Sequence, residues 1–288
     1  MAASERLILG TVQFGLRYGI NNRRGQVSAP EVQNILSRAH DAGIRHLDTA
    51  AAYGDAAARI GAFHRADERR FSVITKFKSA QRAAGPVLKE QLATLGVEQA
   101  FGYLFHSPDA LRDDPDSLAE LVHLRRAGLI RHIGVSIYTN EQFDTAINTE
   151  AIDLIQLPYN LLDNRRRRGE LIDAAKAAGK LVHTRSVFLQ GLFFKKPDKL
   201  PQALLGLRDE LVELRDIAHR FRLTTAQLGL GYALANPQID GVLIGVDGLG
   251  QLEVNLAAAA QPLPAAAIAA IDDLYVSNPR LLNPSNWS

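Results

Sequence analysis

The chain has 288 residues and no cysteine, which excludes disulfides, thiolate zinc sites, cysteine-ligated iron–sulfur clusters and a cysteine nucleophile. Its 33 Lys and Arg residues nearly balance 31 Asp and Glu residues, so it lacks the basic excess of a nucleic-acid-binding protein. The first residues do not resemble a signal peptide, and no run of about 18 apolar residues could form a membrane helix. We therefore expect a cytoplasmic protein without a nucleic-acid or membrane partner, existing as a monomer or a weak homo-oligomer.

Short apolar runs alternate with helical sequence along the chain. The runs that we predict as buried strands are 7–10, 44–49, 71–76, 101–106, 131–136, 153–157, 180–186 and 241–246. The first clear helix begins after Ser28, where Glu31 completes a capping-box pattern. Further helices are predicted at 86–95, 117–127, 210–221, 225–235 and 251–258, and glycines such as Gly96 and Gly128 end several helices.

Eight strands, each followed by helical sequence, predict a parallel sheet with both faces buried. In a chain of this length we expect one α/β domain, a closed (β/α)8 TIM barrel with its active site at the C-terminal ends of the strands. A doubly wound open sheet is the alternative. The domain is expected to span residues 1–288, with a tail at about 275–288 that can lie over the barrel mouth. Residues 188–208 are predicted to form a lid or loop after the seventh strand.

Ionisable residues stand at the ends of three consecutive predicted strands. Asp48 lies near the end of the second strand, with Tyr53 five residues later, while Lys76 ends the third strand and His106 the fourth. Because the carboxyl ends of barrel strands gather at one face, these four side chains are expected to meet there. They combine a carboxylate, a phenol, an ammonium and an imidazole.

Such a set suits the addition of a hydride and a proton to a carbonyl group. A phenol with an ordinary pKa of about 10 is a poor acid at neutral pH, but a neighbouring ammonium such as Lys76 favours its phenolate. Asp48 can keep a buried Lys76 charged, and His106 can orient the carbonyl oxygen. No amino acid donates a hydride, so a nicotinamide or similar cofactor is required.

The same residues resemble the aldo-keto reductase family. Residues 48–54 are similar to the signature around its catalytic Asp and Tyr, and Lys76 and His106 match its other two catalytic residues. Segments 134–136, 155–160 and 251–255 are similar to motifs on the cofactor side, so the resemblance runs from about Leu9 to Asn255. It implies a barrel that binds extended NADP(H) without a Rossmann domain and reduces aldehydes or ketones.

The resemblance also implies roles for further residues. The expected cofactor-binding residues are Thr11, Val12, Asp48, Ser136, Gln156, Arg185, Ser186, Val187, Leu189, Gly191, Gly245, Val246, Gln251 and Asn255. Ser136 and Gln156 would hold the nicotinamide carboxamide. The expected substrate-binding residues are Tyr18, Tyr53 and His106. Trp287 is added to them from its place one residue before the end of the sequence, where it can pack over the barrel mouth and shape the substrate pocket, and a frayed tail is the alternative.

Three positions depart from the family pattern. Ile137 replaces an Asn of many members, and Arg185 replaces an aromatic residue that often stacks on the nicotinamide. The Arg185 charge would disfavour the oxidised ring or help to bind an anionic substrate. The usual residues for the 2′-phosphate are unmatched, and Asp247 would repel a phosphate that it faced. We therefore expect the protein to use NADP(H) with only a weak preference over NAD(H), and use of NAD(H) is the alternative.

Segments 14–19, 182–192 and 278–280 resemble a bacterial subgroup associated with polysaccharide or nucleotide-sugar pathways. This resemblance points to a sugar-derived or anionic carbonyl compound as substrate.

Two other functions remain open: a Schiff-base lyase that uses Lys76, and a non-enzymatic regulatory protein on the same barrel. The histidines lack metal-binding spacings, so no metal site is predicted. The four arginines at 165–168 are expected to form a solvated surface patch, with a dimer contact or an anionic ligand as the alternative.

Overall fold

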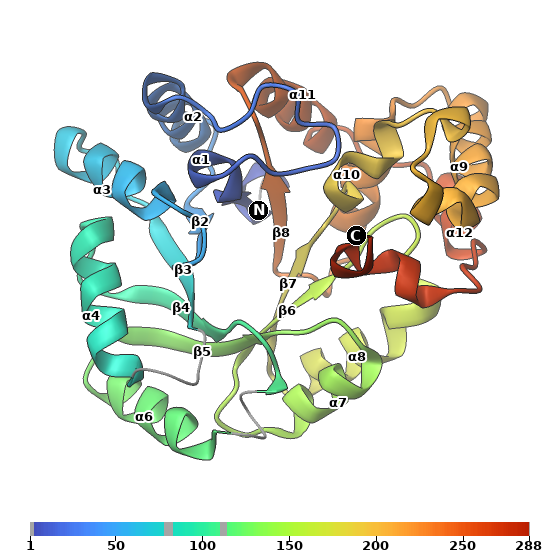
Figure 1. Cartoon of the computed structure of the whole chain (residues 1–288). Helices are drawn as coiled ribbons and strands as arrows, with labels where there is room; N and C mark the ends of the chain where they lie inside the picture. Colours follow the sequence, from blue (N-terminus) through green and yellow to red (C-terminus); the bar gives the residue numbers. More distant parts are fainter. Residues whose placement is uncertain (1–2, 78–82, 110–113, 288) are drawn as a thin grey trace.

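The computed structural model describes residues 3–77, 83–109 and 114–287. Eight parallel strands form a closed barrel in sequence order (Figure 1). The strands are β1 (Leu7–Gly10), β2 (His46–Asp48), β3 (Ser72–Phe77), β4 (Ala100–Phe105), β5 (Ile130–Ser136), β6 (Leu154–Pro158), β7 (Leu181–Arg185) and β8 (Gly241–Gly245). Strand β8 pairs with β1, and this closure confirms the single-domain barrel and excludes the open sheet.

Helices surround the barrel on all sides (Figure 1). The α-helices are α1 (Val12–Gly15), α2 (Ala29–Asp41), α3 (Ala56–Ala66), α4 (Ala84–Leu95), α6 (Pro115–Arg126), α7 (Asn140–Asn148), α8 (Arg165–Ala177), α9 (Arg208–Arg220), α10 (Thr225–Ala235), α11 (Leu249–Ala259) and α12 (Ala265–Asp272). Helix α4 ends as predicted, because Gly96 has a φ of 67° that glycine adopts without strain. Within the described residues, no helix is long and apolar enough to span a bilayer.

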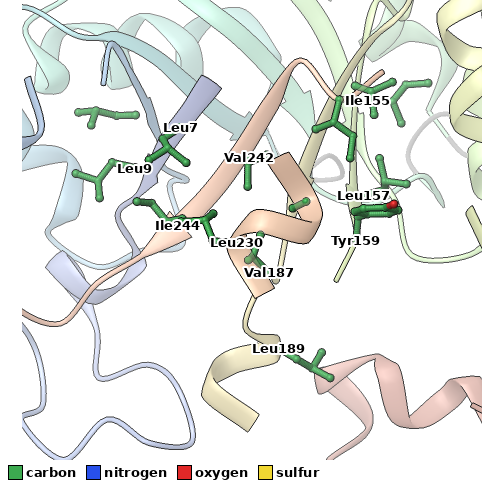
Figure 2. Close-up of a cluster of buried hydrophobic side chains, with 14 of the residues drawn as sticks. Leu7, Leu9, Ile155, Leu157, Tyr159, Val187, Leu189, Leu230, Val242 and Ile244 are labelled. Carbon is green, nitrogen blue, oxygen red and sulfur yellow. The ribbon is translucent and has the colours of Figure 1, made fainter. Parts of the chain in front are cut away.

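The alternation of side chains along each strand divides the core into two parts. Leu7 and Leu9 of β1 face outward, where Figure 2 shows them near Ile244 of β8 and Leu230 of α10 in the main hydrophobic cluster. Ile8 instead belongs to a smaller cluster inside the barrel with Ile74, Leu104, Leu154 and Leu243. Toward the carboxyl ends of the strands, the same inward positions carry polar residues, and this change opens the site described below.

The structure differs from the sequence-based predictions in local detail. Strand β2 is shorter than the predicted run 44–49. The segment after β7 contains three short 3-10 helices, η2 (Leu189–Phe194), η3 (Pro197–Lys199) and η4 (Gln202–Leu207), rather than only loop. Ser28 does occupy the N-cap of α2, but its side chain makes no capping hydrogen bond. Glu31 accepts a hydrogen bond from the backbone N–H of Leu249 instead, at 2.9 Å.

The expectation of a solvated arginine patch is wrong for Arg168. Its guanidinium is only 1% exposed and donates to both carboxylate oxygens of Asp163, at 2.7 and 2.8 Å. It also donates to Asn140 Oδ1 and to the backbone oxygen of Tyr138, each at 2.6 Å. A buried cation without such partners would be costly, so this arginine is a structural element of α8. Its neighbours at 165 and 166 remain exposed.

Candidate active site

A cavity of about 580 Å³ lies at the carboxyl ends of the strands, within the usual size range of small-molecule sites. Most of the predicted site residues line it: Thr11, Val12, Tyr18, Asp48, Tyr53, Lys76, His106, Ser136, Gln156, Arg185, Ser186, Val187, Gly191, Gly245, Gln251 and Asn255. The alternation within each strand explains this, because Asp48, Lys76 and Gln156 occupy inward positions at their strand ends.

Three predicted residues do not line the cavity. Leu189 and Val246 are fully or almost fully buried in the hydrophobic core beside it. Trp287 packs against the same core, and its indole Nε1–H donates to the backbone oxygen of Leu281 at 2.8 Å. The tail after α12 forms two short 3-10 helices, η5 (Pro279–Leu282) and η6 (Pro284–Asn286), which hold the tryptophan in that position.

A buried ion pair joins the ends of β2 and β3. Lys76 Nζ lies 2.5 Å from Asp48 Oδ1 and also donates to the backbone oxygen of Thr49 at 3.2 Å. Both charged side chains are almost completely buried. Burial is the largest influence and would lower the pKa of Lys76, but Asp48 and Tyr53 together more than offset it, and the pKa of Lys76 lies above its ordinary value. Lys76 is therefore a positive charge at neutral pH.

Tyr53 lies beside this ion pair on the turn that follows β2. Lys76 Nζ is 5.5 Å from the centroid of the Tyr53 ring. The turn is held from the other side by Gly15 at the end of α1, where an added Cβ would overlap the carbonyl oxygen of Tyr53. Only glycine allows the two backbones to approach so closely. Gly15 thus fixes the position of the Tyr53 phenol through the backbone, although no sequence pattern assigns it a role in the chemistry.

The second oxygen of Asp48 is bound from across the barrel. Gln156 Nε2 donates to Asp48 Oδ2 at 2.8 Å, and the backbone N–H and hydroxyl of Thr11 both donate to the Asp48 backbone oxygen. Gln156 is fully buried, yet its Oε1 has no hydrogen-bond partner among the described residues. An unsatisfied buried oxygen costs about 1–3 kcal/mol unless a ligand donates to it. Gln156 and its register neighbour Ser136 therefore fit a carboxamide such as that of nicotinamide.

The chain turns sharply over the cavity after β7. Ser186, Leu189 and Gln190 have left-handed φ values of 60°, 46° and 54°, which are strained for residues other than glycine. Hydrogen bonds hold this turn: Asn160 Nδ2 donates to the Ser186 backbone oxygen, and Ile20 N–H donates to the Gln190 backbone oxygen, each at 3.1 Å. The loop after β1 and the turn after β7 are thereby joined at the cavity mouth.

Arg185 enters the cavity from the end of β7. Its guanidinium lies 4.0 Å from the centroid of the Tyr138 ring and donates to the backbone oxygen of Ile137 at 3.1 Å. Tyr138 also lines the cavity and was not among the predicted residues. The sequence held no signal for it, because its role depends on its contact with an arginine 47 positions away.

The far end of the cavity meets the start of α11. Asp247 lines the cavity there, and its backbone N–H donates to Gln251 Oε1 at 3.0 Å. Two residues from the other end of the chain also reach this helix start. Glu31 accepts from the first helical N–H, and the Arg24 guanidinium lies against Gly248, where an added Cβ would overlap it. Neither residue was predicted, because each is more than 200 positions from α11.

The sequence and the structure were compared with known proteins. The model of the aldo/keto reductase family matches residues 6–276. The aldo-keto reductase str7 of Strobilurus tenacellus is 25% identical, with 83% of this chain and 80% of that protein covered. The L-glyceraldehyde 3-phosphate reductase of Escherichia coli is also 25% identical, with 84% and 83% covered. Mycobacterial aldo-keto reductases match at 32–33% identity, but over only about half of their own length.

The fold has close counterparts among solved structures. The holo form of the aldo-keto reductase AKR11C1 from Bacillus halodurans superposes with a TM-score of 0.75 at 23% identity, covering 92% of this chain and 90% of that one. With the family model matching nearly the whole sequence, the chain belongs to the aldo/keto reductase family, whose members are oxidoreductases.

Proposed function

We propose that this protein reduces an aldehyde or ketone to an alcohol with NAD(P)H, and that Tyr53 is its general acid. The observation that carries this proposal is the buried Lys76–Asp48 ion pair beside the Tyr53 ring, in a cavity that His106 also lines. These are the groups that the protonation of a developing alkoxide requires. A reduced nicotinamide dinucleotide, when bound, supplies the hydride.

Each residue then has a defined task. His106 donates a hydrogen bond to the carbonyl oxygen and orients it. Tyr53 delivers its hydroxyl proton to the same oxygen as negative charge develops there. Lys76, at 5.5 Å from the ring, stabilises the phenolate that remains, and Asp48 keeps Lys76 protonated.

Cofactor contacts are proposed for the lining residues that the family pattern predicts. Gln156 Oε1 would accept a hydrogen bond from the nicotinamide carboxamide, and Ser136 would help to hold the same group. Thr11 and Val12 would lie along the nicotinamide ring. The rest of an extended dinucleotide would follow the lining toward α11, past Ser186, Val187, Gly191, Gly245, Gln251 and Asn255.

The substrate is proposed to be a small, sugar-derived carbonyl compound. The name of the Escherichia coli relative, L-glyceraldehyde 3-phosphate reductase, supports testing short sugar aldehydes first. A direct assay follows the loss of near-ultraviolet absorbance of NADPH or NADH with such aldehydes. Carbonyl-dependent oxidation of the cofactor that Tyr53→Phe abolishes supports the proposal, and oxidation that survives this change refutes the role of Tyr53.

The lyase alternative is disfavoured by the state of Lys76. A Schiff-base nucleophile must be a neutral amine, whereas Asp48 and Tyr53 together hold the pKa of Lys76 above its ordinary value against the effect of burial. Treatment with borohydride and a carbonyl substrate should therefore leave no adduct on Lys76. A non-enzymatic role predicts instead that no aldehyde is reduced although the cofactor binds.

A further inference from the structure

Two lysine or arginine side chains belong to the described lining of the cavity, Lys76 and Arg185. The charge of Lys76 is compensated by Asp48 at 2.5 Å. Arg185 differs, because its hydrogen-bond acceptors among the described residues are uncharged: the backbone oxygen of Ile137 at 3.1 Å and Ser186 Oγ at 3.5 Å. Among the described residues, no carboxylate lies within ion-pair distance of it. Among the residues that the structure describes, the cavity therefore contains one permanent positive charge without a counter-ion.

The position of this charge is fixed by its surroundings. The guanidinium lies over the Tyr138 ring at 4.0 Å. The Tyr138 backbone is itself held at both polar atoms, since its N–H donates to Gln142 Oε1 at 2.8 Å and its oxygen accepts from Arg168 at 2.6 Å. Arg168 in turn is bound to both oxygens of buried Asp163. A rigid platform under Arg185 lowers the entropy that the side chain would lose on binding a ligand.

Arg185 also lies near both the reacting groups and the cavity mouth. Burial tends to lower the pKa of Lys76 and Asp48 with Tyr53 more than offsets this, while Arg185 adds the smallest effect, in the lowering direction. Burial raises the pKa of Tyr18, which lines the cavity mouth, and the charge of Arg185 opposes that shift too. A guanidinium has five N–H donors, and the two acceptors above leave the others free to bind an anion.

We propose that Arg185 forms an anion subsite inside the active-site cavity, so that the preferred substrate carries a phosphate or carboxylate group close to its carbonyl. This inference rests on the proposed function, because it names the substrate class of the same site. The anionic group would take the free N–H donors of the guanidinium while the carbonyl oxygen lies at Tyr53 and His106. A neutral carbonyl compound would leave the guanidinium without a counter-ion and bind more weakly.

The test compares matched substrates that share a carbonyl and differ in charge. Glyceraldehyde is paired with glyceraldehyde 3-phosphate, and butanal with 4-oxobutanoate, at saturating cofactor. We expect kcat/KM to favour the anionic member of at least one pair by about ten- to hundredfold, the usual range for hydrogen bonds to a charged group. The pair with the larger ratio distinguishes a phosphate from a carboxylate subsite. Ratios near one in both pairs would overturn the inference.

Variants assign that preference to one residue. Arg185→Gln should bring the anionic-to-neutral ratio close to one, whatever happens to the absolute rates. Arg23→Gln, at an exposed arginine that is absent from the described lining, removes the same charge and should keep the wild-type ratio. A ratio that survives Arg185→Gln, with only the cofactor KM altered, would show that Arg185 serves the cofactor instead. If Arg185→Gln does not fold, Arg185→Lys replaces it and must lower the ratio, because lysine lacks the planar fork.

A binding measurement separates this inference from the proposed function. Calorimetry with glycerol, glycerol 3-phosphate and 4-hydroxybutanoate at saturating cofactor needs no turnover. Anion-dependent binding that Arg185→Gln weakens about tenfold or more, and Arg23→Gln does not, supports the subsite even if no carbonyl compound is reduced. Equal binding of the anions to the wild type and to Arg185→Gln overturns it.

Discussion

Lys76 and Asp48 form an ion pair of 2.5 Å between neighbouring strands, and both side chains are almost completely buried. A pair in this setting stabilises the fold only while it is complete, since either charge alone would be buried without a partner. The ion pair thus links the stability of the barrel to the charge state on which the proposed chemistry depends.

Removal of one partner tests this link. Asp48→Asn should lower the free energy of unfolding by about 3–5 kcal/mol, because it leaves the Lys76 ammonium uncompensated. The double variant Asp48→Asn, Lys76→Met should be less destabilised than the single one, as urea titrations of both proteins would reveal. If the single variant loses less than about 1 kcal/mol of unfolding free energy, the pair contributes no more than a surface salt bridge does. That result would contradict the role that we assign to its burial.

Gly15 is predicted to control catalysis through the position of Tyr53. Because a Cβ on Gly15 would overlap the Tyr53 carbonyl oxygen, Gly15→Ala must displace the turn that carries the phenol. A displacement of about 1 Å can cost about a hundredfold in rate, so we expect a fall of that order in kcat. Gly169→Ala in α8 is the matched control, since the atoms nearest to its new methyl group all belong to the flexible, exposed side chain of Arg165. Equal kcat values for the two variants would argue against this role.

His183 makes stability depend on pH. Burial, and then the charges of His46, His132 and Lys176, lower the pKa of His183 to about 3 inside the barrel. The unfolded chain therefore binds a proton at His183 from about pH 6.5 downward, while the folded chain does so only near pH 3. Stability due to neutral His183 is complete above pH 6.5 and declines as the pH falls toward 3.

Melting temperatures measured between pH 7.5 and 4 would show this decline. His183→Phe should make the decline smaller, because phenylalanine has a similar shape and does not titrate. His219→Gln, at an exposed histidine of α9, should leave the decline unchanged. An identical pH dependence for wild type and His183→Phe would assign the effect to other groups.

The start of α11 is predicted to limit the preference for NADPH. A helix N-terminus attracts phosphate, but Glu31 already occupies its first N–H and Asp247 adds a second carboxylate, while Arg24 lies nearby as a cation. We expect kcat/KM for NADPH to exceed that for NADH by less than about tenfold. Asp247→Ser should raise this ratio and Arg24→Gln should lower it, while Asp209→Asn, at an exposed side chain of α9, should not change it. A large wild-type preference for NADPH would contradict this account.

The sequence was sufficient for the barrel and for the polar residues at the ends of its strands, and the reason is local; the other predicted lining residues came from the resemblance to the family. Strand and helix periods, together with glycines such as Gly96 at helix ends, are properties of short segments. The inward direction of Asp48, Lys76 and Gln156 follows from strand alternation once the strands are known.

The remaining features depend on contacts between distant segments. The contacts of Arg168 with Asn140 and Tyr138, the hydrogen bond that α11 donates to Glu31 and the stacking of Arg185 on Tyr138 each join residues from different elements, and no local pattern encodes them. Trp287 was expected over the barrel mouth, but the 3-10 helices of the tail hold it instead against the core, with its indole N–H bound to the backbone oxygen of Leu281.

The most direct test of the central claim is the rate of aldehyde-dependent NAD(P)H oxidation by wild type and Tyr53→Phe, measured together with dinucleotide binding by thermal shift. If Tyr53 is the general acid, Tyr53→Phe binds the dinucleotide as the wild type does, with the melting temperature raised by the ligand, but loses kcat by about a hundredfold or more. Aldehyde reduction at the wild-type rate by Tyr53→Phe would contradict the account.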